Sequence, residues 1–593
     1  NYESDSGKKQ KSMSYQCPWH TQNIVAMLDK TDKPQARSIP VSWKSRTWVT
    51  GLNANNSRLD KTCGHNSVFK KQMTYKNLQF IITGEYSIMK KSISLFFALL
   101  IALSSALVGC SDGAETSGNN DPPSSAEISA PENETAETET AETEAGLTGD
   151  DLPDDLDFDG ETITIHIRNG DNGNPEGNCV MEMTVEELNG ELLNDAIYNR
   201  NLAVNERLNV QIDPYVSYDW TGYGNCLAEI RASINANEDT FDIIAGWCNG
   251  DITSLALEGC FLDLKGAEYI DLEKPWWNQS LVGTNAMGGK NFFVTGEANV
   301  LTSLGSAFSV FVNEKIATDY QLGSLADYVL EGTWTIDKMS EITEMVYEDL
   351  NGNAETDDAD RFGLVLVNYL AADAFYTSLD IHQVKIDNEG NMTYEPDAER
   401  IHTAVEKVTN LHWNNPGALG WLPDTNRQIF LEGRSLMSLE FMEAAREQFR
   451  DMEDSYYIIP MPKFDEAQEQ YRAFIFNNLT LLSVPVTNQN TDATYATMEA
   501  LSSESYFNVT PVFFEDCMQN KYARSETTAQ MLEIIRESCY IDYEYIYGGL
   551  FNKPVFIFRD LVGAKSSDSA SWIASKTKPI QKSIERAMEK FSQ

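Results

Sequence analysis

The chain has 593 residues, and its 90 Asp/Glu against 45 Lys/Arg give a formal net charge of −45. So acidic a balance argues against binding nucleic acid or an anionic membrane through a basic face. Apolar residues make up 42% of the sequence, and the length allows two separate cores, so the charge does not exclude a large globular fold.

Residues 1–88 differ in composition from everything that follows. They carry 13 Lys/Arg against 6 Asp/Glu and hold no sustained apolar period of 2 or 3.6 residues. Gly84-Glu85, which GGAGAA can encode as a ribosome-binding sequence, lies just before Met89. We interpret 1–88 as spurious upstream translation, because export signals of the kind that follows belong at an N-terminus. The rival is a genuine domain ahead of the signal.

A segment typical of an export signal begins at Met89. Two lysines precede an apolar run over 93–108, which is shorter than the roughly 20 apolar residues of a membrane-spanning helix. The run ends in Leu-Val-Gly-Cys, which resembles the lipobox of bacterial lipoproteins. That resemblance implies a signal peptide over 89–109 and a diacylated Cys110, anchored on the extracytoplasmic side of the cell membrane. The alternative is an ordinary signal peptide with a chance cysteine.

An acidic tether follows the lipobox. From Ser111 to Gly160 there are 16 Asp/Glu and no Lys or Arg, so the segment repels itself and cannot bury enough apolar surface to fold. We expect residues 110–160 to form an extended, disordered linker.

The globular part, 161–593, opens with alternating strand and helix patterns. Alternation over 161–169 predicts a strand, helical spacing follows over 193–208, and a short strand pattern covers 209–216. A second helix around 227–234 leads into the apolar stretch 241–247. This order indicates a parallel sheet with helical crossovers, in which ligands bind beyond the carboxyl ends of the strands.

Eight short stretches then follow one another between residues 160 and 560. They are FDIIAGW, LDLKGAEYIDLEKPWWNQSL, FVTGEANV, VFVNEKIATDYQL, GTWTIDKMSEI, DLNGNAETDDADRFGL, FLEGRSLMSLEF and IIPMPKFDEAQEQY. Their order resembles the landmarks of the extracellular solute-binding proteins of ABC transporters, in the carbohydrate-associated family 1 branch to which maltose-binding protein belongs.

This resemblance implies a two-lobed, periplasmic-binding-protein-like α/β fold with a hinge. The chain would leave lobe one near 294–303, return near Arg427 and cross again within 473–488. Lobe one would then comprise about 161–295 and 427–475, and lobe two about 300–426 and 486–593. Hinge motion would close the lobes around a ligand.

The resemblance also implies a function. The protein would be a monomeric lipoprotein that captures a sugar or oligosaccharide and delivers it to the separate membrane permease of an ABC importer. It would need no cofactor. Whether the ligand is a mono- or an oligosaccharide stays open.

Candidate ligand-binding residues are taken from the strand ends and the hinge crossings. A sugar presents C–H faces to aromatic rings and hydroxyls to carboxylates, amides or arginine, and an unpaired buried polar group there costs about 1–3 kcal/mol. The candidates are Arg168, Asn169, Asp171, Trp247, Asn249, Glu297, Asn299, Asn368, Tyr369, Trp413, Trp421, Glu440, Phe441 and Asn477.

Several aromatic and acidic residues have a structural alternative. Trp247 could cap the core, and Glu297 could hydrogen-bond hinge amides. Trp276, Trp277 and Trp334 are expected to pack, and we leave them out of the site.

The stretch DLNGNAETDDAD has the spacing of a calcium loop. Oxygen ligands would come from positions 1, 3, 5, 7, 9 and 12, with a backbone carbonyl serving at position 7. These positions are held by Asp349, Asn351, Asn353, Glu355, Asp357 and Asp360. Position 6 is Ala354 rather than glycine, and position 12 is Asp rather than Glu. A structural Ca²⁺ and an acidic surface turn are both compatible with the pattern.

Six cysteines follow Cys110, without the spacing of a zinc site. Export permits disulfides, but the residues could equally be buried free thiols. The six are Cys179, Cys226, Cys248, Cys260, Cys517 and Cys539.

An amphipathic helix is expected to close the chain. Ile580, Ile584, Met588 and Phe591 lie along one face, and Pro579 would occupy an early turn.

The sequence favours a binding protein over an enzyme. It has no HExxH, GxSxG or GxxxxGK[ST] motif. A glycosidase needs only two carboxylates, so that class stays open as an alternative. A surface-binding lipoprotein without a transport role is a second alternative, although the internal repeats common in adhesins are absent.

Overall fold

The computed structural model describes residues 149–169, 178–218, 224–248, 251–284, 288–387, 390–421, 423–518, 526–566 and 568–591. All of them belong to one compact unit, Glu137–Gln593. The predicted upstream segment, the signal peptide, Cys110 and the first part of the tether lie outside the described residues.

The last part of the predicted disordered tether is folded, which corrects the boundary at residue 160. Asp150 accepts hydrogen bonds from Arg207 and Ser503, and Leu152 is buried. The backbone N–H of Phe158 donates to the carbonyl of Leu208 at 3.0 Å. Charge composition misled here, because a partner arginine and a few apolar side chains are enough to hold this acidic segment.

The first sheet confirms the predicted strand–helix–strand–helix–strand unit. Its strands are β1 (Glu161–Asn169), β2 (Val210–Tyr218), β3 (Ile243–Trp247) and β12 (Thr480–Ser483), in the order β12-β3-β1-β2. β1 is parallel to β2 and β3, whereas β12 is antiparallel to β3. The crossovers are the helices α4 (Leu192–Leu208) and α5 (Gly224–Ala236). We call this sheet and its helices the first lobe.

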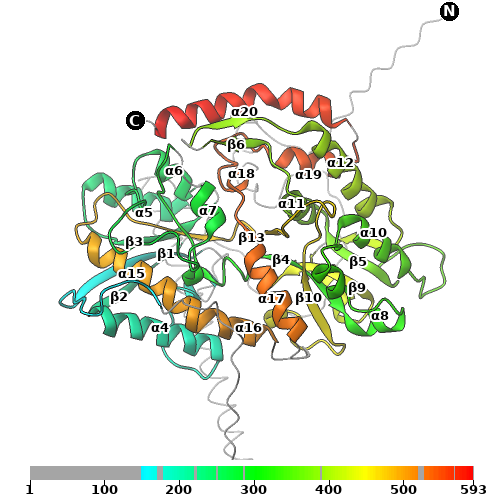
Figure 1. Ribbon diagram of the computed structural model, residues 1–593, viewed down its shortest axis with the longest axis horizontal. Helices are drawn as coiled ribbons and strands as arrows, with labels where there is room; N and C mark the ends of the chain where they lie inside the picture. The colour runs from blue at the N-terminus through cyan, green and yellow to red at the C-terminus, as the bar shows by residue number, and fades with distance from the viewer. Residues whose placement is uncertain are drawn as a thin grey trace, which may run out of the picture. The chain divides into compact units, whose positions relative to one another are not determined.

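A second, five-stranded sheet organises the second lobe. Its strands are β4 (Phe308–Asn313), β5 (Phe362–Val367), β8 (Ala418–Trp421), β9 (Ser435–Phe441) and β10 (Tyr456–Pro460), in the order β10-β4-β9-β5-β8. β5 is parallel to β8 and β9, and β4 is antiparallel to β9 and β10. Every residue of β4 and β5 is buried, as expected of strands covered on both faces. Figure 1 shows the two sheets with β13 between them.

The expected return to the first lobe near Arg427 is wrong. β9 takes the central position of the second sheet, and β10 takes its edge, so the stretch 427–475 stays in the second lobe. The chain rejoins the first sheet only at β12. Helix α15 (Thr491–Glu504) then packs on β1 and α4, so it also belongs to the first lobe rather than the second. The order of landmarks along a sequence does not state which strands pair, and pairing decides the lobe.

The remaining elements lie in or between the lobes. Those before β9 are α3 (Asn178–Met181), α6 (Asp251–Leu257), α7 (Gln279–Thr284), η2 (Glu297–Asn299), α8 (Glu314–Asp319), α9 (Leu325–Leu330), α10 (Ile336–Met345), α11 (Asn368–Ser378), β6 (Val384–Ile386), β7 (Met392–Tyr394), α12 (Ala398–Thr409), η3 (Asn410–Asn414) and α13 (Pro423–Leu431). Those after it are α14 (Ala444–Glu447), β11 (Ala473–Phe474), η4 (Ser505–Val509), α16 (Thr510–Met518), α17 (Glu526–Ser538), β13 (Cys539–Tyr540), α18 (Tyr543–Ile546), α19 (Phe556–Gly563) and α20 (Ser569–Phe591).

The closing helix α20 is longer than predicted, and Pro579 lies inside it rather than in an early turn. The predicted face is correct: Ile580, Ile584 and Phe591 are buried. The helix contacts both β7 of the second lobe and α6 of the first, and Phe591 stacks on Phe292 at 5.7 Å between ring centres. This helix therefore ties the two lobes together (Figure 1).

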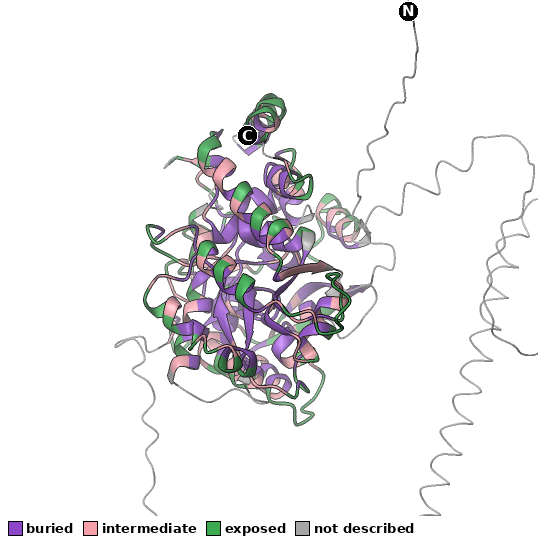
Figure 2. Ribbon diagram, turned by 90° about the vertical axis from the view of Figure 1, so that its right-hand side faces the viewer, coloured by how far each residue is buried: buried purple, intermediate pink, exposed green. Residues whose placement is uncertain are grey.

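Two apolar clusters run from one lobe to the other. One joins Ile244 and Ile252 of the first lobe to Phe308 and Leu364 of the second. Another packs α4 against the second sheet through Leu193, Val300 and Phe311, among others. Figure 2 shows this buried interior under a shell of exposed helix faces. The lobes consequently meet through shared hydrophobic contacts as well as through the crossing segments.

Candidate functional site

The first-lobe candidates lie where predicted, at the carboxyl edge of the parallel strands. Arg168 and Asn169 end β1, and Trp247 ends β3 at the same level, because Ile167 pairs with Ala245. Asp171, Asn249 and the side chain of Asn169 lie outside the described residues.

The second-lobe candidates also gather at one edge. Val367 at the end of β5 pairs with Trp421 at the end of β8. Glu440 and Phe441 end the parallel neighbour β9, and Asn368 and Tyr369 begin α11 directly after β5. The side chains of Asn368 and Trp421 are outside the described set.

The crossing segment Phe476–Asn478 connects these two edges. The indole N–H of Trp247 donates to the backbone carbonyl of Asn477, and the thiol of Cys248 contacts the same oxygen at 3.4 Å. One residue earlier, the ring of Phe476 lies 5.3 Å from that of Phe441. Three consecutive residues therefore hold the strand ends of both lobes together, and the candidate site is centred on them.

Arg168 reaches the same segment from β1. Its Nη2 donates to the backbone carbonyl and, at 3.2 Å, to the side-chain oxygen of Asn478. Arg168 is only 1% exposed, and in the described part of the chain its Nε and Nη1 atoms have no hydrogen-bond partner.

Glu440 is held by an arginine rather than left free. Arg427 of α13 donates from Nε to Oε1 at 3.1 Å and from Nη2 to Oε2 at 3.0 Å. The Glu440 side chain is almost completely buried, and burial raises its pKa although Arg427 opposes the shift. The pair places a rigid polar group beside Phe441, whose ring packs edge-on against Phe308 at 4.6 Å.

A cluster around Tyr369 was only partly anticipated from sequence. Tyr369 is exposed, and the guanidinium of Arg559 lies 5.7 Å from its ring centre. Arg559 forms a two-point pair with buried Asp373, one turn further along α11. Burial raises the pKa of Asp373, and Arg559 partly offsets the shift. No motif marked Arg559, because it comes from α19, almost two hundred residues after α11.

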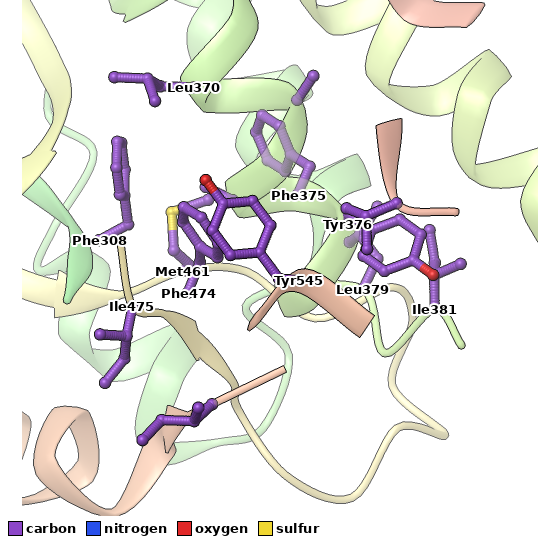
Figure 3. Close-up of a cluster of buried hydrophobic side chains, with 14 of the residues drawn as sticks. Phe308, Leu370, Phe375, Tyr376, Leu379, Ile381, Met461, Phe474, Ile475 and Tyr545 are labelled. Atoms are coloured by element: carbon purple, nitrogen blue, oxygen red, sulfur yellow. The ribbon is translucent and has the colours of Figure 1, made fainter. Parts of the chain in front are cut away.

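Tyr545 connects the cluster around Tyr369 to β11, the strand that precedes the crossing segment. Its ring meets Phe474 of β11 at 4.9 Å, nearly perpendicular, and lies 6.2 Å from Phe556. Figure 3 shows Tyr545 beside Phe474, with Leu370 and Phe375 of α11 nearby. Sequence reasoning missed Tyr545, since the stretch YIDYEYIY carries no recognisable ligand motif.

Glu297 and Asn299 lie inside the hinge. Glu297 accepts a hydrogen bond from the Thr510 hydroxyl and lies 3.9 Å from Arg536, and burial raises its pKa. Asn299 is fully buried and donates to Glu182 at 3.3 Å. The described partners of both residues belong to the protein itself.

A buried polar network stabilises this hinge. Glu182 accepts from the backbone N–H of Thr302 at 2.9 Å and from its hydroxyl at 2.8 Å. Arg200 donates to the carbonyl of Glu182 at 2.7 Å and to Ser505 at 3.1 Å. Burial raises the pKa of Glu182 and lowers that of Arg200 to about 10. The chain segment 297–302, which crosses between the lobes, is therefore held by several buried hydrogen bonds.

Trp413 is not brought to the site. It lies in the helical turn η3, which precedes β8, at the opposite end of that strand from Trp421. Its indole N–H donates to the carbonyl of Val562 at 2.9 Å, and Lys565 lies 4.3 Å above the ring.

The tryptophans assigned to packing do pack. Trp276 and Trp277 are buried and each donates to one oxygen of Glu499 at 2.9 Å. Trp334 is buried and donates to the carbonyl of Pro460 at 2.9 Å.

The calcium-like loop turns at its sixth position although that residue is not glycine. Ala354 at position 6 has a positive φ of 61°, and Asp349 accepts from the N–H groups of Gly352 and Ala354 at 2.7 and 2.8 Å. Asn351 and Asn353 donate to Asp357, and Glu355 is exposed. In the part of the chain that the structure describes, no group of three or more His, Cys, Asp or Glu side chains converges as a metal site. Calcium binding stays a prediction.

The six cysteines of the folded unit are thiols that form no disulfide within the described residues. Five are buried, and burial raises the pKa of both Cys517 and Cys539. Of the two alternatives that the sequence left open, the structure has the reduced one.

A search of family models finds no match for this chain, and no curated protein matches it. Solved structures do match. Among them are extracellular solute-binding proteins and maltose- or maltodextrin-binding proteins. Among the described residues, no helix combines the length and apolar character needed to cross a membrane.

Three of the solved structures illustrate the likeness. The GacH receptor of Streptomyces glaucescens is 15% identical over 72% of this chain and 97% of its own, with a TM-score of 0.42. A family 1 extracellular solute-binding protein of Bifidobacterium longum subsp. infantis is 10% identical over 70% and 99%, with a TM-score of 0.45. A sugar transporter of Rhizobium etli is 11% identical over 71% and 98%, with a TM-score of 0.47. The strand order, and not these likenesses, carries the fold assignment.

Proposed function

We propose that this protein is the solute receptor of an ABC importer, which captures a carbohydrate between its two lobes and delivers it to a membrane permease. The observation that carries the proposal is the crossing segment Phe476–Asn478, which contacts Trp247 at the carboxyl edge of the first sheet and Phe441 at that of the second. Ligands of parallel α/β sheets bind at such edges. A solute at this point touches both lobes.

Carbohydrate is the solute class that the side chains favour. Trp247, Phe441 and exposed Tyr369 supply aromatic surface for the C–H faces of a sugar ring. Arg168 supplies donors for ring substituents. The combination of flat apolar platforms and a few fixed polar groups suits a polyhydroxylated ring.

The same geometry favours binding over glycoside hydrolysis. A glycosidase needs one carboxylate free to attack or to activate water and a second that can transfer a proton. Here Glu440 and Asp373 are each engaged at two points by arginine. Delivery to a permease, a lipid on Cys110 and the reach of the acidic tether complete the proposal, with the permease and its ATPase as separate chains.

A thermal-shift screen with mono- and oligosaccharides tests this function on the secreted protein from Ser111 onward. Saturating ligand at a hundredfold excess over Kd stabilises the fold by about 2.7 kcal/mol, which a melting curve resolves. Chromatography of the sugar after incubation separates receptor from enzyme, since a receptor returns its ligand unchanged. Small-angle scattering with the stabilising sugar should report compaction, and an unchanged profile would count against capture by lobe closure.

A sugar that is consumed would instead support the glycoside-active alternative. Tight sugar binding with no uptake defect after gene deletion would support a surface-binding lipoprotein without a transport role.

A further inference from the structure

Three arginines lie close to the facing edges of the lobes, and they differ in one respect. Arg427 is paired at two points with Glu440, and Arg559 with Asp373. Arg168 contacts only the neutral carbonyl oxygens of Asn478. Within the described residues, it is the arginine of the three that lacks a carboxylate.

The lack of a carboxylate partner matters because Arg168 is buried. Arg168 is 1% exposed, so bulk water hardly reaches its charge, and its Nε and Nη1 atoms have no hydrogen-bond partner among the residues that the structure describes. Buried charges in proteins are normally paired, because an isolated one costs several kcal/mol. The absence of a pair is unexpected in a chain with a net charge of −45, where carboxylates outnumber basic residues two to one.

The position of Arg168 connects it to the site. Its Nη2 is held by Asn478, and the preceding residue, Asn477, accepts the indole N–H of Trp247. The guanidinium is thus fixed beside the crossing segment that joins the lobes. A further backbone contact, from the thiol of Cys179 to the carbonyl of Arg168 at 3.1 Å, holds the end of β1 in place.

We propose that the carbohydrate captured here carries an anionic oxygen group, such as the carboxylate of a uronic acid or a sulfate ester, and that this group pairs with Arg168. The proposal rests on the proposed function and narrows it from carbohydrates to acidic carbohydrates. The anion supplies a counter-charge and accepts a charge-assisted hydrogen bond from Nη1 or from Nε, the nitrogens that Asn478 does not hold.

The first test needs no ligand. Arg168→Met removes a buried charge that has no carboxylate partner among the described residues, so the ligand-free protein should melt at the same or a higher temperature. Arg427→Met leaves the buried carboxylate of Glu440 without its arginine, so this variant should melt at a lower temperature than the wild type. If Arg168→Met lowers the melting temperature as much as Arg427→Met does, Arg168 is already neutralised within the protein, and the proposal is overturned.

The second test compares matched ligands on the wild-type protein by calorimetry. Digalacturonate and its neutral dimethyl ester share ring stereochemistry and differ in charge, and lactose 3′-sulfate and lactose form the corresponding sulfate pair. A wider panel of neutral and acidic oligosaccharides accompanies them. We expect binding to be confined to acidic members, with at least about tenfold preference within a matched pair. The pair that responds distinguishes carboxylate from sulfate.

Variants of Arg168 test whether this residue causes the preference for acidic sugars. Arg168→Gln should abolish the preference for the charged member, whereas Arg168→Lys should weaken binding but retain the preference. Arg231→Gln on α5, which breaks a surface pair with Glu258, serves as the matched control and should change neither. Preferential binding of neutral sugars would overturn the acidic assignment and leave the proposed function intact. No binding across the whole panel would overturn the proposed function itself.

Discussion

The indole N–H of Trp247 donates to the backbone carbonyl of Asn477, a residue 230 positions further along the chain. This contact attaches the end of β3 to the segment by which the chain re-enters the first sheet. It also fixes the orientation of the indole, since the N–H is directed at the crossing segment. Trp247 thereby serves the hinge and offers its ring to the candidate site.

Replacement of Trp247 should separate these two roles. Trp247→Ala removes the ring and should weaken sugar binding about tenfold or more, whereas Trp247→Phe keeps an aromatic face and should have a smaller effect. Titration calorimetry with the sugar from the screen measures both. Trp413→Phe is the control, because that indole bonds to Val562 away from the site. Equal losses in Trp247→Ala and Trp413→Phe would contradict the site.

The pair between Arg427 and Glu440 should show strong coupling. Arg427→Met alone leaves a buried carboxylate unpaired and should cost about 3–5 kcal/mol in urea unfolding. The double variant Arg427→Met with Glu440→Leu removes both charges and should recover most of that loss. Additive losses in the double variant would show that the pair is not the source of the effect.

The contribution of Glu499 to the free energy of unfolding should fall as pH rises toward and through neutrality. Its carboxyl accepts the indole N–H groups of Trp276 and Trp277, yet burial raises its pKa from 4.5 to about 7. A raised pKa means that the folded state binds the proton more tightly. The stability contribution is therefore complete below pH 4.5 and is lost as pH rises through about 7, by on the order of 3 kcal/mol.

The comparison with Glu499→Gln isolates this contribution from other buried carboxyls. The variant should be less stable than wild type at acid pH and should flatten the pH dependence between pH 4.5 and 7, measured as unfolding free energy at several pH values. Glu258→Gln is the control of opposite sign, because Arg231 lowers the pKa of Glu258 by hydrogen bonding. An unchanged slope in Glu499→Gln would refute the assignment.

The loop 349–360 gives a prediction for metal binding. If Ca²⁺ binds, millimolar calcium should raise the melting temperature relative to EGTA by mass action, and Asp357→Asn should remove that increase. Asp360→Asn should destabilise the protein by about 2–3 kcal/mol with or without calcium. The reason is that Asp360 accepts from Tyr347 at 3.1 Å and from the N–H groups of Leu350 and Asp357, both at 3.2 Å. Identical melting curves in calcium and EGTA would leave the loop an acidic turn.

The cysteines should alkylate only after unfolding. Iodoacetamide without reductant should leave the native folded unit largely unmodified over minutes, since five of its six thiols are buried. In guanidinium chloride, all six should be modified, as intact mass would show. Thiols that stay blocked in denaturant until reductant is added would indicate disulfides instead.

Local patterns in the sequence were sufficient to predict the parallel unit of the first lobe. The apolar alternation of β1 and the continuous apolar run of β3 depend on neighbours close in sequence, and both strands formed as predicted. The rim position of Arg168 and Trp247 followed from the same reasoning, because parallel strands place their carboxyl ends at one edge. The packing role of Trp276 and Trp277 was predicted as well, although Glu499, which accepts both N–H groups, was not.

Long-range pairing decided the rest. The assignment of β9 and β10 to the second sheet, and of α15 to the first lobe, depends on contacts that no local period encodes. Helix α15 is buried at every position from Ala493 to Ser503, polar residues included, so its sequence does not separate an exposed polar face from an apolar one that would reveal its partner. The site gained Arg559 and Tyr545 for the same reason, since both reach it from the C-terminal part of the chain.

By itself, the sequence determined the strands and helices that open the first lobe, the closing helix and the edge at which the first-lobe residues collect, because those depend on spacing along the chain. Only the tertiary structure decided which strands share a sheet, which charged residues find partners and which do not. Arg427 and Arg168 look alike in sequence. Arg427 meets a carboxylate thirteen residues later, and Arg168 meets none among the described residues, because the folded backbone sets what lies within hydrogen-bonding distance.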